Sequence, residues 1–82
     1  MPEYYYVYLL KDIATETHHY TGFTKDLNAR LLRHNRGQVP HTAPFRPWRI
    51  ETCIAFISEE KARAFEQHLK SGSGRAFAKK HF

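Results

Sequence analysis

Residues 4–10 read YYYVYLL and residues 18–23 read HHYTGF, two aromatic and apolar stretches separated by the polar residues 11–17. Aromatic and β-branched residues in short uninterrupted runs are typical of β-strands. The polar segment between the runs predicts a hairpin connection. Side chains of a strand alternate between its two faces, so Tyr8 is expected on one face of this hairpin with Tyr20 beside it.

The segments after the hairpin predict helices and one further strand. Helix-forming residues follow a capping Thr24 or Asp26 and end at Gly37, and Ser58 is placed to cap a second helix. Three prolines make residues 38–47 a loop. The expected elements are strands at 4–10, 18–23 and 48–57, and helices at 25–36, 59–71 and 75–82.

This order, β-β-α-β-α-(α), predicts one α+β domain over residues 1–82: a small three-stranded antiparallel sheet with flanking helices. The net charge of +5 favours a polyanionic partner. No apolar run reaches the roughly 18 residues of a membrane span, and no basic amphipathic helix suits a bilayer surface. The lone cysteine, Cys53, excludes an internal disulfide, is expected to fill core space, and fits the reducing cytoplasm.

Two basic residues of the first helix fall on the side expected to face the sheet. At about 100° per residue, Arg30 and His34 lie within about 60° of Leu27 around the helix axis. The alternative for Arg30 is that its stem covers apolar surface while its head stays in water.

The second helix places a carboxylate in its apolar stripe. Glu66 shares the i, i+3, i+4, i+7 pattern of a buried face with Ala62, Phe65 and Leu69. A carboxylate there is costly to desolvate unless it is paired or bound to a cation. A salt bridge to Lys70 or Arg63 would supply a partner, and this alternative weighs about equally with a functional one.

Together, these residues resemble the GIY-YIG nuclease superfamily, and nearest the short stand-alone UvrC-like endonuclease domains of the UPF0213 type. The resemblance rests on YVYLL at 6–10, YTGFTKDLNARLLRHN at 20–35 and EQHLK at 66–70. It covers nearly the whole chain and implies the GIY-YIG endonuclease fold. Tyr6 stands where the family has its first glycine, and Thr21 replaces isoleucine. The added ring at Tyr6 bears on the substrate class more than on catalysis.

The resemblance also implies roles for five side chains. Glu66 would be the protein carboxylate on a divalent metal, Mg²⁺ or Mn²⁺. Tyr8 would act as general base or orient the attacking water, with nearby cations favouring its phenolate. Arg30 would supply such a charge and hold the scissile phosphate. Tyr20 would position water or phosphate, and His34 is a candidate for proton relay or phosphate contact.

Other basic residues are expected to grip the phosphate backbone in a stripe. These are Lys25, Arg33, Arg36, Arg46 and Arg49. Trp48 and Phe45 flank Arg46 and offer rings for an unpaired base, although core packing is the preferred interpretation of Trp48.

The leading hypothesis is a metal-dependent nuclease that acts on DNA, selects structure rather than base sequence, and serves DNA repair or recombination. RNA is not excluded as the substrate. The sequence leaves a monomer and a weak homodimer equally open. One alternative is a nucleic-acid-binding module that keeps the fold without useful catalysis. Another is an unrelated α+β interaction domain in which the tyrosines are merely core.

Overall fold

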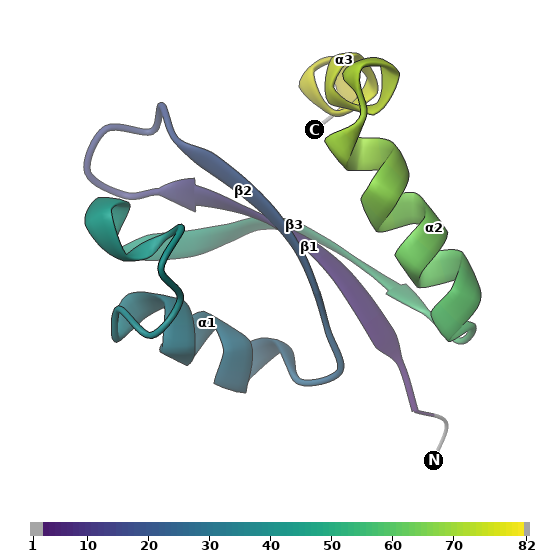
Figure 1. The fold of residues 1–82 in the computed structure, drawn as a ribbon, viewed down its shortest axis with the longest axis horizontal. Helices are drawn as coiled ribbons and strands as arrows, with labels where there is room; N and C mark the ends of the chain where they lie inside the picture. Colours follow the sequence, from purple (N-terminus) through teal and green to yellow (C-terminus); the bar gives the residue numbers. More distant parts are fainter. Residues whose placement is uncertain (1–2, 82) are drawn as a thin grey trace.

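A three-stranded antiparallel sheet separates two helices, and a third helix follows the second (Figure 1). The computed structural model describes residues 3–81, without the side chains of residues 75, 77 and 78. The predicted α+β class and the order β-β-α-β-α-α are confirmed. The elements are β1 (Tyr5–Asp12), β2 (His19–Thr24), α1 (Leu27–Asn35), the 3-10 turn η1 (Ala43–Phe45), β3 (Trp48–Phe56), α2 (Glu59–Lys70) and α3 (Gly72–His81).

The strand order β2-β1-β3 puts β1 at the centre of the sheet. Tyr8 in β1 lies opposite Gly22 on one side and opposite Cys53 on the other. The pairing with β3 shifts between Leu9 and Leu10, which leaves Glu51 as the extra residue of a β-bulge. The central strand therefore carries Tyr8 directly beside the glycine of β2.

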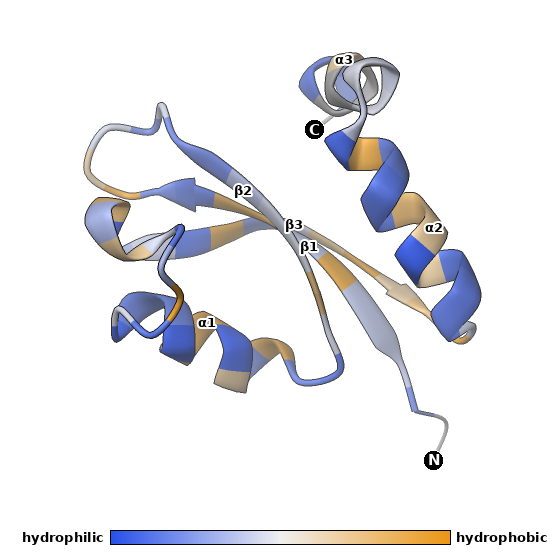
Figure 2. Ribbon diagram, in the orientation of Figure 1, coloured by the Kyte–Doolittle hydropathy of each residue, from blue (hydrophilic) through white to orange (hydrophobic). Residues whose placement is uncertain are grey.

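Each face of the sheet has its own hydrophobic core. Alternation along β1 sends one set of side chains toward α2 and the other toward α1. The buried residues of the α2 face are Val7, Leu9, Ala62 and Leu69, and those of the α1 face are Tyr8, Leu10 and Trp48. Figure 2 shows hydrophobic residues in stretches of β1 and β3 and hydrophilic ones over much of α1 and α2. Tyr8 therefore belongs to the core of the α1 face, whereas Glu66 lies on the helix that covers the other face.

The loop between α1 and β3 is tied to both elements through Trp48 and Asn35. The Asn35 side chain donates to Trp48 O at 3.0 Å and accepts from Trp48 N at 2.6 Å, and Trp48 Nε1 donates to Thr42 O at 2.9 Å. Trp48 is buried, as the preferred interpretation predicted. Phe45 is exposed and stacks on His18, with 4.0 Å between ring centroids.

Three predicted helix boundaries are confirmed, and the predicted start of the third helix is not. Asp26 accepts from Ala29 N and Ser58 from Lys61 N, and Gly37 ends α1 with a φ of 76°. The fourth prediction, a third helix at 75–82, is corrected, because α3 already begins at Gly72. A Cβ at Gly74 would collide with the backbone of His68, so glycine lets α3 start against the end of α2. Residue 82 lies outside the described residues.

The prediction that Cys53 fills core space is wrong, because Cys53 is exposed. It shares the α1 face with Tyr8 but belongs to the outer strand β3. Helix α1 packs its apolar residues against Trp48 and Ile50, at the other end of β3. Within residues 3–81, no helix has the length and apolar character needed to cross a membrane.

Candidate active site

The Tyr8 hydroxyl is the centre of a polar cluster between β1, β2 and α1. Tyr8 is only 1% exposed, and its Oη accepts a hydrogen bond from Arg30 Nε at 3.3 Å. The same Oη lies 2.9 Å from His34 Nε2. A Cβ at Gly22 would collide with the Tyr8 phenol. Glycine at this position of β2 therefore gives the hydroxyl the room to reach both partners.

His34 is fully buried and bonds through both of its ring nitrogens. Its Nδ1 lies 2.7 Å from Thr42 Oγ1, whose hydroxyl donates to Val39 O at 3.3 Å. With the Thr42 proton donated to Val39 O, the Thr42 oxygen accepts from His34 in its Nδ1–H tautomer. Nε2 is then unprotonated and accepts from the Tyr8 hydroxyl. The hydrogen bond to Tyr8 supports the predicted role of His34 as a proton relay. The predicted phosphate contact is not supported, because His34 is fully buried.

The environment keeps both His34 and Tyr8 neutral. Burial, followed by the charges of Arg30 and Arg33, lowers the pKa of His34 to about 4. Burial also raises the pKa of Tyr8, and this outweighs the opposing hydrogen bond and charge of Arg30. The expectation that nearby cations favour the Tyr8 phenolate is thus corrected: the cation is present, but desolvation dominates.

Arg30 connects the two tyrosines. Its hydrogen bond to Tyr8, with further contributions from the charge and hydrogen bond of Tyr20, raises its pKa, although burial acts in the opposite direction. The side chain is half-buried with Nε on Tyr8 Oη, so its head does not simply extend into water. The Tyr20 ring lies 6.4 Å from that of Tyr8 and 5.0 Å from that of His34. The pair of tyrosines predicted for the hairpin is confirmed.

Glu66 belongs to α2, which packs on the sheet face opposite the Tyr8 cluster. Its side chain is 12% exposed, in keeping with its place in the apolar stripe, and its negative charge contributes to the raised pKa of Tyr8. The salt bridge left open as an alternative is present: Lys70 Nζ lies 3.2 Å from Glu66 Oε2. Arg63 instead pairs with Glu59 at 3.2 Å. Glu66 is thus a shielded carboxylate with one lysine partner and an electrostatic link to Tyr8.

The donor set at Glu66 matches a metal that takes few protein ligands. Within the described residues, no group of three or more His, Cys, Asp or Glu side chains could hold a metal ion. Magnesium keeps several waters and needs only one or two carboxylates. A single shielded carboxylate fits that requirement, whereas zinc would need three or four protein ligands. A cation at Glu66 would compete with Lys70 for the carboxylate.

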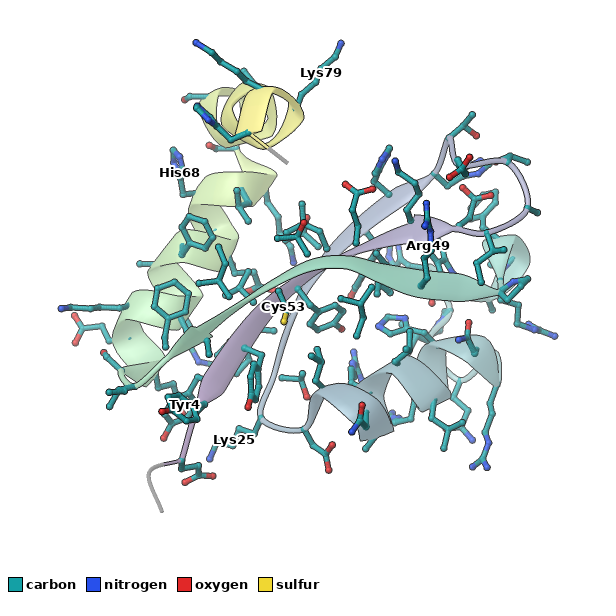
Figure 3. The ribbon with its side chains drawn as sticks, turned by 180° about the vertical axis from the view of Figure 1, so that it is seen from behind. Tyr4, Lys25, Arg49, Cys53, His68 and Lys79 are labelled. Atoms are coloured by element: carbon teal, nitrogen blue, oxygen red, sulfur yellow. The ribbon has the colours of Figure 1, made fainter. Side chains whose placement is uncertain are left out.

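The predicted backbone-gripping residues do not form one stripe. Arg33 and Arg36 are exposed on the last turn and at the end of α1, and Arg46 donates to Ala43 O in the following loop. Arg49 pairs with Glu16 at 2.7 Å and aligns with Lys11, on the sheet face opposite α1. Figure 3 shows Lys25 and Arg49 far apart.

Two residues that the sequence did not single out position the site. Thr42 is buried and fixes the tautomer of His34, but a threonine in a proline-containing loop carries no signal of this role. Asp12 is buried and accepts from Thr15 Oγ1 at 2.6 Å and from His18 N at 2.8 Å. These bonds outweigh the effect of burial and lower the pKa of Asp12. Asp12 thereby holds the hairpin that leads into Tyr20.

Comparison with known proteins matches the chain along nearly its whole length. The model of the GIY-YIG catalytic domain matches residues 4–80. A UPF0213 protein of Halalkalibacterium halodurans is 33% identical over 72 residues, which cover 87% of this chain and 74% of that protein. A UPF0213 protein of Staphylococcus aureus strain Mu3 is 32% identical over 68 residues, which cover 82% of this chain and 80% of the relative.

Proposed function

This chain belongs to the GIY-YIG superfamily of endonucleases. We propose that it is a metal-dependent nuclease that hydrolyses phosphodiester bonds in DNA. One observation carries the proposal. The buried Tyr8 hydroxyl is held between Arg30 and His34, within the electrostatic reach of Glu66. A buried tyrosine hydroxyl needs one hydrogen-bond partner, and Tyr8 has two charged or titratable partners and a glycine opposite its ring.

In the proposed reaction, water attacks phosphorus and the bond to the leaving alcohol oxygen breaks. Tyr8 Oη takes a proton from the attacking water while its own proton passes to His34 Nε2. His34 then returns this proton to Tyr8 as Tyr8 releases one to solvent, and the departing alkoxide takes a proton from solvent. The direction of the hydrogen bonds supports this order, because neutral His34 accepts from Tyr8. A phenol with a raised pKa is a poor phenolate but can relay a proton in a concerted step. Arg30 supplies positive charge for the phosphate.

Glu66 is the proposed ligand of Mg²⁺, or of Mn²⁺, within this site. When bound, the cation would stabilise negative charge on the phosphate and on the departing oxygen. The Lys70 ammonium lies 3.2 Å from the same carboxylate. It keeps the shielded Glu66 charge paired when no cation is present, because a buried unpaired carboxylate is unfavourable.

The proposed substrate is DNA recognised by structure rather than base sequence, in repair or recombination. The exposed Arg33 and Arg36 on the helix that carries Arg30 are placed to contact phosphates beside the site. The exposed thiol of Cys53 fits the reducing cytoplasm, which we propose as the location. We propose a monomer or weak homodimer, with a second copy or a second event needed to cut both strands.

The test compares the purified protein with Glu66→Gln on labelled single-stranded, duplex, flapped and nicked DNA and on matched RNA. Mg²⁺, Mn²⁺ or EDTA is added to each reaction. Glu60→Gln is the matched control, because Glu60 is exposed on the same helix. We expect cleavage that requires metal, is lost in Glu66→Gln and persists in Glu60→Gln. Salt-sensitive binding without cleavage would instead favour the nucleic-acid-binding module.

A further inference from the structure

A groove of about 880 Å³ lies between the sheet and the helices α2 and α3. The buried Leu9 of β1 and Leu69 of α2 meet at its floor, and Tyr20 of β2 also lines it. Such a volume falls within the usual range of small-ligand sites, about 300–1,000 Å³. A space of this size with an apolar floor suits a flat, mostly apolar group.

The groove wall is basic. Lys11, Lys70 and Lys79 line it from β1, α2 and α3, together with two histidines and one carboxylate, Glu51. Lys11 is paired with Glu51 at 2.8 Å, and Lys70 with Glu66 at 3.2 Å. Within residues 3–81, Lys79 makes no ion pair. Figure 3 shows Lys79 extending from α3 on the side nearer the hairpin of β1 and β2. Its charge is thus available for an anion at the groove.

The groove lies on the α2 face of the sheet and the Tyr8 cluster on the α1 face, and two residues border both. Tyr20 lines the groove, and it also lies beside Tyr8 and His34 in the polar cluster. Lys70 lines the groove, and it also pairs with Glu66. A strand with its phosphate at Tyr8 and Arg30 would reach the groove by passing around the edge strand β2, which lines the groove with Tyr20.

We propose that this groove binds an unpaired nucleotide adjacent to the scissile phosphate, with the base over the leucine floor beside Tyr20 and a phosphate near Lys79. This inference rests on the proposed nuclease function. A nucleotide combines a flat apolar ring with an anion, which matches the apolar floor and basic wall. A paired base shows only its edges in the grooves of a duplex, so entry requires an unpaired base. The substrate class is then single-stranded or locally unpaired nucleic acid.

The test measures binding by fluorescence anisotropy in EDTA, which separates binding from cleavage. The probes are oligothymidylate of about 12 nucleotides, the same strand with abasic sites, oligouridylate, and a duplex of equal length. Lys79→Glu is compared with Lys80→Glu, because Lys80 is an exposed neighbour that does not line the groove. Both substitutions lie on the exposed surface of α3 and make the same change in charge, so folding is not at risk.

We expect Lys79→Glu to weaken binding of oligothymidylate about fivefold and to lower its salt slope by about 0.7, the value of one single-strand phosphate contact. Lys80→Glu should change affinity less than about twofold. The abasic strand should bind about tenfold more weakly, since it keeps the charge but loses the base. Comparison with oligouridylate assigns the nucleotide to DNA or RNA.

Equal losses for Lys79→Glu and Lys80→Glu, equal affinity for abasic and intact strands, or tighter binding of the duplex would each overturn the proposal. Failure of the nuclease function looks different. It would appear as absent cleavage with Mg²⁺ while this binding pattern remains intact.

Discussion

Acidification should destabilise this protein through one residue, His34. The folded state lowers the pKa of His34 from its ordinary 6.5 to about 4. Between these values the unfolded chain binds the proton that the folded chain rejects. The contribution of neutral His34 to the free energy of unfolding is therefore complete above its ordinary pKa. This contribution is lost as the pH falls toward the pKa of His34 in the folded protein.

The size of the effect follows from the shift. From about pH 7.5 to about pH 4.5, the free energy of unfolding should fall by about 2.5 kcal/mol, at 1.36 kcal/mol per pKa unit. With a urea m-value of about 1 kcal/mol/M for a small domain, the midpoint moves down by about 2.5 M. The lowered pKa of Asp12 acts only below its ordinary value of 3.8, outside this window.

The assay is urea unfolding followed by circular dichroism across this pH range, in the natural protein and in His34→Gln. A glutamine amide keeps a donor and an acceptor for Tyr8 and Thr42 but does not titrate. We expect the acid dependence to be smaller in His34→Gln by about 2.5 kcal/mol. Parallel stability curves for the two proteins would refute the assignment of a neutral, buried His34.

Three further substitutions test the framework around the site. Gly22→Ala should lower the melting temperature and the cleavage rate together, because its Cβ collides with the Tyr8 phenol; unchanged values would contradict the packing described. Asn35→Ala should cost about 1–3 kcal/mol in urea unfolding, because it leaves Trp48 N and O without their side-chain partner. Cys53→Ser should change stability by less than about 0.5 kcal/mol, because the thiol is exposed; a larger loss would restore the core assignment.

Sequence periodicity predicted the site residues that interrupt an apolar helical stripe with a charge. A charged residue in an apolar helical stripe stands out, which is why the sequence alone places Arg30 and Glu66 toward the sheet. The helical position of His34 was equally readable, but its contact with Thr42 was not, because it depends on the path of an irregular loop.

The sequence also could not predict properties that depend on the balance of opposing physical effects. The cation beside Tyr8 was predicted, yet the upward shift of the Tyr8 pKa depends on how deeply the ring is buried. Cys53 shows the same limit. Strand alternation predicts which face of the sheet carries Cys53. Whether the thiol is covered depends on how far α1 extends along that face.

The central claim is that Tyr8 and Glu66 belong to one catalytic centre for phosphodiester hydrolysis. The most direct measurement is the single-turnover cleavage rate of Tyr8→Phe, Glu66→Gln and the double variant, with Mg²⁺ present. Residues that act as a unit have non-additive effects. We predict that each single variant loses at least about 100-fold and that the double variant loses little more than the slower single one. Losses that multiply, or a Tyr8→Phe variant with the natural rate, would contradict the account.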